Sequence, residues 1–387
     1  MSSSSIMLSL MSRNAEKHLA ALATVPGIGR VTLRNIYYSQ RKHGWKWDKF
    51  WVLDPKITTK IPISENIVKA IKNWLNENTI NSNFSDLEKK SVRVVVLGSP
   101  EYPPLLAQVS RPPILLFAKG AIPDWTVPVI AVVGTRTMTN YGKNATRKLC
   151  SELASSGALI ISGSMYGIDS EAHQTALSVG APTIGVLGYG FNHVYPSTQK
   201  SLLEEIVSSG GTLYSEYAPS VEPRPGNFVA RNSIVAGMAA ATIVVEAAAK
   251  SGSHITAQFA LDANRTVCAV PGPITNPYSE GTKWLINEGA IMVSSGADVL
   301  AELGVEGMLD LPASRDERPQ LETELERALY SELEAGSQTF SQALTNLAVP
   351  MLDLQTTITQ LEIRGVLERQ GEVLSICHNS FGRIQSV

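Results

Sequence analysis

The spacing of hydrophobic and polar positions changes along the chain at about residue 91. Before that point apolar residues recur at helical spacing, as in residues 14–23, 31–39 and 67–75. After it, short runs that are apolar at every position alternate with stretches of helical spacing. We therefore predict a basic helical region followed by a region of alternating strands and helices.

Continuous apolar runs bounded by turn residues are typical of strands buried on both faces, as in a parallel sheet covered by helices. The alternation with helices indicates βαβ units. We expect an α/β fold for residues 91–305, a Rossmann-like parallel-sheet layer sandwich. The predicted strands cover residues 92–97, 114–118, 129–133, 158–161, 183–187, 212–215, 242–245, 267–270 and 291–293.

The flanking regions differ from this pattern. Residues 1–12 are expected to form a disordered tail and residues 13–90 a helical domain. Residues 306–320 look like a linker. Residues 321–387 combine three helical segments with a hairpin that turns at Gln370-Gly371, a pattern that favours a winged helix.

Six of the predicted strands are followed within two residues by a glycine or a glutamate. Parallel strands end at one edge of the sheet, where doubly wound folds bind ligands. Glycine permits close approach there, and helix N-termini attract anions. We expect a phosphate- or nucleotide-binding edge, although these residues could simply end strands. They are Gly134, Gly163, Gly188, Glu216, Glu246 and Gly272.

Charge is distributed unevenly among the 387 residues, although the formal net charge is only −2. Residues 1–90 carry 14 Lys and Arg against 7 Asp and Glu, a balance of +7. Residues 91–314 have a balance of −4 and residues 315–387 one of −5. The near-neutral total therefore neither excludes nucleic acid nor supports it.

Several classes of site find no support in the sequence. The three cysteines are far apart, no His and carboxylate cluster has metal-ligand spacing, and glycine-rich dinucleotide and P-loop fingerprints are absent. We expect no cofactor, no metal and no catalytic residue. No segment is long and apolar enough for a membrane span, and the N-terminus lacks a signal peptide, so we expect a cytoplasmic protein.

A series of short motifs between residues 91 and 300 strongly resembles the DNA-processing protein A family (DprA, also called Smf). The motifs are Gly134-Thr-Arg136, Ser162-Gly-Ser-Met-Tyr-Gly-Ile-Asp169, Gly185-Val-Leu-Gly-Tyr-Gly190, Tyr195-Pro196, Phe228-Val-Ala-Arg-Asn232, Ser251-Gly-Ser-His-Ile-Thr-Ala257 and Pro271-Gly272.

This resemblance implies a non-enzymatic, cytoplasmic homodimer that binds single-stranded DNA without regard to sequence. It also implies that the protein loads the recombinase RecA during natural transformation and recombination. A helical N-terminal domain and a C-terminal winged helix often flank the central domain of this family, and both are expected here.

Candidate contacts follow from the chemistry of the matched positions. Arg136 has a guanidinium suited to a phosphate, unless it pairs with Glu216 or Glu246, the two carboxylates expected to support the site. Phe228 could stack on a base or pack beneath its loop, with Arg231 on a phosphate. The full set of candidate DNA or phosphate contacts is Gly134, Thr135, Arg136, Lys143, Ser162, Gly163, Phe228, Arg231, Asn232, Lys250, Ser251, Gly252, Ser253 and Thr256.

Two positions depart from the family pattern, because Tyr166 and Ser233 stand where it usually has arginine. Electrostatic affinity should fall, unless Tyr166 stacks. The sequence Val25-Pro-Gly-Ile-Gly-Arg30 resembles a helix-hairpin-helix loop, as in SAM-like domains, so Gly27, Gly29 and Arg30 are possible further contacts; such loops can also merely join helices.

Two rival functions remain open. The same layer fold resembles nucleoside-monophosphate phosphoribohydrolases, often labelled lysine decarboxylase-like, but their Pro-Gly-Gly-x-Gly-Thr-x-x-Glu loop is missing after Pro271-Gly272. A nucleotide sensor that binds a small phosphate ligand is the other. For the winged helix, its acidic balance favours contact with a protein over binding in a DNA groove.

Overall fold

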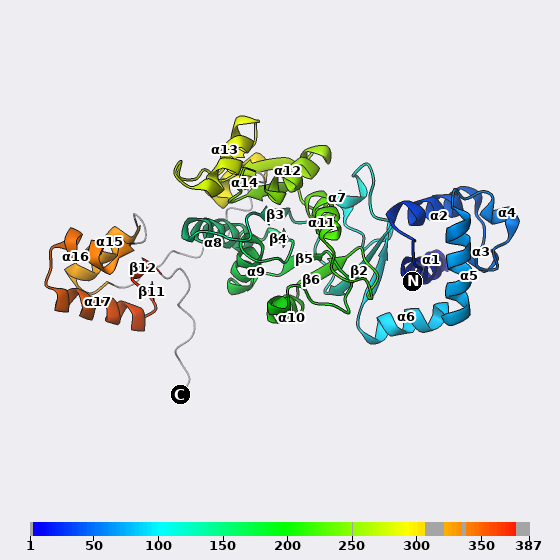
Figure 1. Ribbon diagram of the computed structural model, residues 1–387, viewed down its shortest axis with the longest axis horizontal. Helices are drawn as coiled ribbons and strands as arrows, with labels where there is room; N and C mark the ends of the chain where they lie inside the picture. Colours follow the sequence, from blue (N-terminus) through cyan, green and yellow to red (C-terminus); the bar gives the residue numbers. More distant parts are fainter. Residues whose placement is uncertain (1–2, 250, 306–320, 335–337, 377–387) are drawn as a thin grey trace. The chain divides into compact units, whose positions relative to one another are not determined.

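The computed structural model describes residues 3–249, 251–305, 321–334 and 338–376 (Figure 1). The chain divides into two compact units, Met1–Leu311 and Pro312–Val387. The predicted linker, residues 306–320, lies outside the described residues, and our domain boundaries remain predictions.

The N-terminal part of the first unit is entirely helical among its described residues. We expected a disordered tail over residues 1–12, whereas a helix starts at Ser3, and no Gly or Pro interrupts residues 3–24. Buried aromatic rings, including Trp47, Phe50 and Trp51, pack against one another and against the nearest strands of the sheet. The helices are α1 (Ser3–Thr24), α2 (Arg30–His43), α3 (Trp47–Trp51), α4 (Pro55–Thr58), α5 (Glu65–Glu77) and α6 (Ile80–Lys89).

A nine-stranded sheet forms the centre of the first unit, in the order β1-β2-β6-β5-β4-β3-β7-β8-β9. A strand lies at each position where an apolar run predicts one. The strands are β1 (Arg93–Val96), β2 (Leu115–Gly120), β3 (Val129–Val133), β4 (Leu159–Ser162), β5 (Thr183–Leu187), β6 (Thr212–Ser215), β7 (Ala241–Val244), β8 (Thr266–Ala269) and β9 (Ile291–Met292).

The sheet is mostly parallel, which confirms the predicted mixed α/β class, but two strands correct the prediction of a parallel sheet. β1 pairs antiparallel with β2, and β2 pairs antiparallel with β6. Parallel neighbours need a long crossover, usually a helix. Only the four-residue helix α7 (Pro104–Ala107) lies between β1 and β2, too short a crossover for these neighbours to pair in parallel.

Helices cover both faces of the sheet, and the side chains of β3 alternate between the two cores. Val129, Ala131 and Val133 pack with α11 and α12, whereas Ile130 and Val132 pack with α8 and α9. The order of strands reverses at β3, since β4 lies on one side of it and β7 on the other. The covering helices are α7 (Pro104–Ala107), α8 (Asn140–Ser155), α9 (Ile168–Ser178), α10 (Lys200–Ser208), α11 (Pro225–Met238), α12 (Gly252–Asp262), α13 (Glu280–Asn287) and α14 (Gly296–Glu302).

Within residues 321–334 and 338–376, the second unit contains three helices and a small antiparallel sheet of order β10-β12-β11. Its core includes Leu329, Leu354 and Ile358. The winged-helix assignment remains a prediction. The elements are α15 (Glu324–Glu334), β10 (Gln338–Thr339), α16 (Phe340–Leu347), α17 (Met351–Ile363), β11 (Leu367–Gln370) and β12 (Val373–Ile376). None of the helices in the described part of the chain is long and apolar enough to cross a membrane.

Candidate nucleic-acid site

A cavity of about 650 Å³ lies at the carboxyl ends of β3, β4 and β7, where the strand order reverses. Doubly wound sheets bind ligands at such a switch point. Eleven of the predicted contacts line this cavity, contributed by four separate segments of the chain. They are Gly134, Thr135, Arg136, Gly163, Phe228, Arg231, Asn232, Ser251, Gly252, Ser253 and Thr256.

The loop between β3 and α8 presents Arg136 to solvent. Glu246 holds this loop: one carboxylate oxygen accepts the Thr139 N–H at 2.9 Å, and the other accepts the Thr139 hydroxyl at 2.6 Å. The side chain of Asn276 donates to the same carboxylate at 3.1 Å. Glu246 therefore supports the loop rather than pairing with Arg136, whose guanidinium forms no hydrogen bond or ion pair with the described residues.

Arg231 lies inside the protein, only 3% exposed, which corrects our expectation of a surface phosphate contact. Its Nη1 donates to the carbonyl oxygens of Gly163 and Val186, the latter at 2.6 Å, and its Nε donates to Asn232 at 3.1 Å. Burial lowers the pKa of Arg231, while the charge of Asp169 opposes this shift. Arg231 thus joins the ends of β4 and β5 and places a positive charge behind the cavity wall.

Ser162 is also buried, which corrects its assignment as a contact. It is 0% exposed, and its hydroxyl donates to the carbonyl oxygen of Val132 at 2.6 Å. Its neighbour Gly163 is needed for packing, because a Cβ there would lie 2.3 Å from Nη1 of Arg231. At this strand end glycine makes room for a protein side chain, a role that the sequence did not predict.

Phe228 packs beneath its loop and also reaches the cavity, so stacking on a base remains a prediction. Its ring packs against Gly188, where a Cβ would lie 2.8 Å from Cδ1, and it also lines the cavity. Tyr195 lies beside it, with ring centroids 5.5 Å apart, and is 44% exposed. The sequence analysis quoted Tyr195 only as part of a motif, yet it gives the cavity a second aromatic surface.

Arg224 was missed by the sequence analysis. It is an exposed residue at the N-terminal boundary of α11, and it lines the cavity together with Arg136. The signal available was Arg224-Pro225, since proline favours the first turn of a helix and so places the preceding residue at the helix entrance. Arg224 restores one of the two cations whose absence at Tyr166 and Ser233 we noted.

The remaining candidates divide into three groups. Ser251 caps α12 by accepting the Ser253 N–H at 3.3 Å, so Ser251 and Gly252 lie at the cavity, whereas Ser253 and Thr256 are largely buried in its wall. Lys143, on the first turns of α8, does not line the cavity. Lys250 lies outside the described residues.

Arg30 and Glu216 form an ion pair across 186 residues of sequence. Nε and Nη2 of Arg30 each donate to one oxygen of Glu216 at 2.5 Å. Burial acts to lower the pKa of Arg30, but the hydrogen bond and charge of Glu216 outweigh it and raise that pKa. Glu216 therefore engages the guanidinium of Arg30, which was a possible DNA contact. Gly27 and Gly29, the other two possible contacts of this loop, do not line the cavity.

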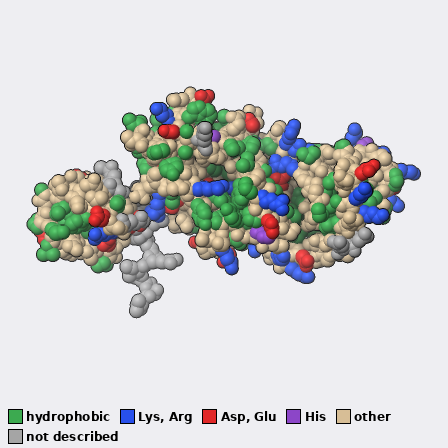
Figure 2. Space-filling model, in the orientation of Figure 1, with side chains coloured by type: hydrophobic (Ala, Val, Ile, Leu, Met, Phe, Trp, Pro, Cys, Tyr) green, Lys and Arg blue, Asp and Glu red, His purple; other side chains and the backbone are tan. Residues whose placement is uncertain are grey.

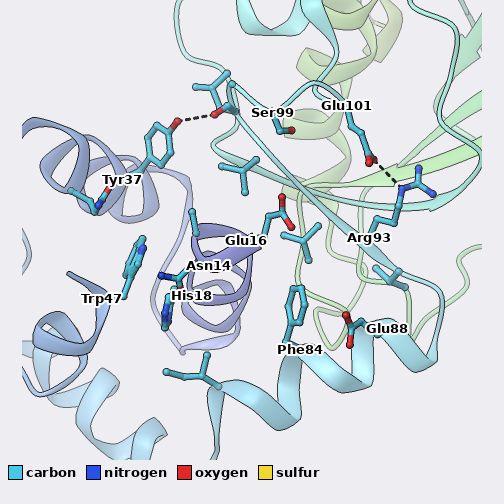
Figure 3. Close-up of a pocket in the computed structure, with 18 of the residues that line it drawn as sticks. Asn14, Glu16, His18, Tyr37, Trp47, Phe84, Glu88, Arg93, Ser99 and Glu101 are labelled. Carbon is cyan, nitrogen blue, oxygen red and sulfur yellow. Dashed lines mark hydrogen bonds and ion pairs between the residues drawn. The ribbon is translucent and has the colours of Figure 1, made fainter. Parts of the chain in front are cut away.

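A larger hollow of about 2150 Å³ lies between the N-terminal helices and β1 (Figure 3). Its lining mixes aromatic rings with charges of both signs, and Arg93 pairs with Glu101 at 3.1 Å. Tyr37 donates to the carbonyl oxygen of Leu97 at 2.7 Å. This hollow contains none of the predicted contacts, so we place the candidate site in the smaller cavity.

Comparisons with known proteins match mainly the α/β part of the chain. The family model described as DNA recombination-mediator protein A matches residues 93–304. The chain is 39% identical to Protein Smf of Escherichia coli over 236 residues, which are 60% of this chain and 63% of that protein. It is 40% identical to DNA processing protein DprA of Streptococcus pneumoniae over 201 residues, 52% of this chain and 71% of that protein.

A comparison of folds also matches this chain to a DNA processing protein A. The X-ray structure of DNA processing protein A from Streptococcus pneumoniae superimposes with a TM-score of 0.64 at 30% sequence identity. The match covers 74% of this chain and 97% of that one.

Proposed function

The chain belongs to the DNA recombination-mediator protein A family, and from this premise we propose that it binds single-stranded DNA in the cavity at the carboxyl edge of the sheet. Binding is independent of sequence and serves DNA processing in recombination and natural transformation. The observation that carries this proposal is the cavity lining, where exposed arginines and aromatic rings lie side by side.

Each part of the lining suits one part of a single strand. Arg136 and Arg224 are exposed cations for phosphates, and the capped N-terminus of α12 adds the positive end of a helix. Phe228 and Tyr195 offer ring surfaces on which any base can stack. Such contacts read no base edge, which is why we expect little sequence preference.

The test is a fluorescence anisotropy titration of the full chain with labelled oligo-dT. Arg136→Ala should weaken binding about 10-fold or more, because a hydrogen bond to a charged group contributes about 1.5–3 kcal/mol. It should also reduce the slope of log affinity against log salt by about 0.7.

Lys148→Ala is the matched control, because Lys148 is an exposed cation on α8 that does not line the cavity. Equal effects of the two variants would overturn the proposal, as would an absence of binding at low salt. Incubation with AMP separates the enzymatic rival, since release of adenine would favour a nucleotide hydrolase.

A further inference from the structure

The outer face of α2 carries cations and an exposed aromatic ring but no carboxylate. At about 100° per residue, Arg30, Arg34, Tyr38 and Arg41 share one face of this helix. Arg41 is exposed, Tyr38 is 48% exposed and Arg34 is partly exposed. The whole helix contains no Asp or Glu, and Figure 2 shows Lys and Arg side chains over the N-terminal helices.

Helix capping explains only part of this charge. Cations in the last turn favour the negative end of the helix dipole, which accounts for Arg41 and Lys42. Arg34 lies in the first half of the helix, where that effect is weak; its side chain is only partly exposed, and its buried Nη2 has no hydrogen-bond partner among the described residues. An unpaired cation beside an exposed ring is the pattern of a surface for single-stranded nucleic acid.

The N-terminal helices are joined to the loops that border the cavity. Glu216, which pairs with Arg30, directly follows β6, and Nζ of Lys90 donates to Asn192 in the loop after β5 at 2.8 Å. Phe191 and Ala218, from the same two loops, pack into the N-terminal hydrophobic core. These contacts place the start of α2 at the carboxyl edge of the sheet.

The same two loops also line the cavity. The loop after β5 contributes Tyr195, and the segment between β6 and α11 contributes Pro223 and Arg224. A strand that leaves the cavity past Arg224 therefore meets the N-terminal end of α2. From Arg30 to Arg41 the helix rises about 16 Å, a length that matches about five phosphates at the spacing of a stacked strand.

We propose that single-stranded DNA leaving the cavity continues along the outer face of α2, with Arg34 and Arg41 on phosphates and Tyr38 against a base. This inference rests on the proposed function and names a second contact surface for the same ligand. It predicts that affinity depends on strand length, because only a long strand reaches from the cavity to Arg41.

The experiment compares two labelled oligo-dT strands of about 6 and about 25 nucleotides. A single binding module covers about 4–16 nucleotides, so the short strand fits within one module and the long strand extends beyond it. The double variant Arg34→Gln/Arg41→Gln should weaken binding of the long strand about 10-fold. It should reduce the salt slope for that strand by about 1.4, the share of two phosphate contacts, and leave the short strand unaffected.

Lys49→Gln/Lys56→Gln is the matched control, because it removes the same charge from exposed positions on α3 and α4 and should change neither affinity. This inference is overturned if the α2 variant and the control bind the long strand with equal affinity. The proposed function still holds in that case, provided that the short strand binds and that Arg136→Ala weakens its binding. If the wild type binds neither strand, the proposed function fails and this inference fails with it. Should Arg34→Gln/Arg41→Gln not fold, as judged by thermal unfolding, Arg41→Gln/Lys42→Gln replaces it, since both of these side chains are exposed.

Discussion

Arg231 and Arg136 line the same cavity, but Arg231 is buried and Arg136 is exposed to solvent. Arg231 is buried and bonded to backbone carbonyls, so removing it would leave those oxygens unpaired and loosen the wall. Arg136 is exposed and can turn toward a ligand. The charge of Arg136 contributes to lowering the pKa of Arg231, after burial, so an anion between them would relieve this repulsion.

His173 lies fully buried on α9, in a hydrogen-bonded position that needs the neutral ring. Its Nδ1 lies 2.8 Å from the hydroxyl of Thr183, and its Nε2 lies 3.3 Å from that of Ser164. Burial, with a smaller effect of Arg231, lowers the pKa of His173 to about 3. His173 therefore has a packing role within the described part of the chain.

The free energy of unfolding should therefore decrease in acid, because the unfolded chain takes up a proton at His173. Unfolded histidine titrates near 6.5, so as pH falls below that value the unfolded state binds a proton that folded His173 does not. Between about pH 7 and pH 5, this one group should remove about 2 kcal/mol from the free energy of unfolding. Urea unfolding followed by tryptophan fluorescence at both pH values measures it.

His173→Gln tests the assignment, since glutamine keeps a polar group but does not titrate. We expect lower stability at neutral pH and a pH dependence smaller by about 2 kcal/mol. His18, whose pKa burial lowers to about 4, and His254, whose pKa burial also lowers, contribute further dependence of the same sign. An unchanged pH dependence in the variant would assign the effect to other groups.

At the scale of elements, α2 and the end of β6 are joined by a pair of charges and by an apolar core. The core, which includes Val94, Phe117 and Ala218, can keep α2 in place without the pair. The carboxylate of Glu216 occupies the guanidinium of Arg30. A phosphate could bind the same guanidinium, since both groups present oxygens to it.

Glu216→Gln should uncover Arg30. We expect tighter binding of a long oligo-dT, about 3-fold, and a salt slope steeper by about 0.7, because one more cation becomes available to a phosphate. The free energy of unfolding should fall by about 1 kcal/mol, since the lost pair is only partly buried. Titration and urea unfolding of the same sample measure both effects.

The double variant Arg30→Gln/Glu216→Gln is the control for that prediction, because it lacks the pair but exposes no cation. Its affinity should return to the wild-type value. Weaker binding by Glu216→Gln would mean that the ion pair itself is required to align α2 with the cavity.

For the whole molecule, the uneven charge separates two roles. We propose that the N-terminal region, at +7, and the cavity contact the nucleic acid, and that residues 315–387, at −5, are better suited to a protein than to a DNA groove. On α17, Met351, Leu352 and Ile363 are exposed apolar side chains, which agrees with that assignment. With a net charge of −2, two copies acting together, as in the homodimer that the family resemblance implies, would raise the affinity of a modest single site.

Recombinase loading is tested with the intact chain. We expect the protein to speed the ATP hydrolysis of RecA on single strands covered by single-strand-binding protein, and Arg136→Ala to lose this effect in proportion to its lost affinity. The Lys148→Ala variant should stimulate RecA like the wild type. Tight DNA binding without any stimulation would separate the proposed loading from the proposed binding.

Much of this protein was determined by local patterns in the sequence. Each buried strand appears as an apolar run, because a strand covered on both faces needs apolar residues at every position. The motifs around Gly134 and Ser251 predicted the edge at which the cavity lies, since parallel strands end together. The family assignment from those motifs is confirmed by the match over residues 93–304.

Only the tertiary structure decided which side chains can reach a ligand and which strands run antiparallel. Burial separates Ser162, at the end of β4, and Arg231, within α11, from the exposed Arg136, because exposure depends on helices that pack from distant parts of the chain. The pairing of Arg30 with Glu216 spans 186 residues, a distance at which sequence spacing carries no signal. Arg224 enters the cavity for the same reason, since the fold brings the start of α11 beside the end of β3.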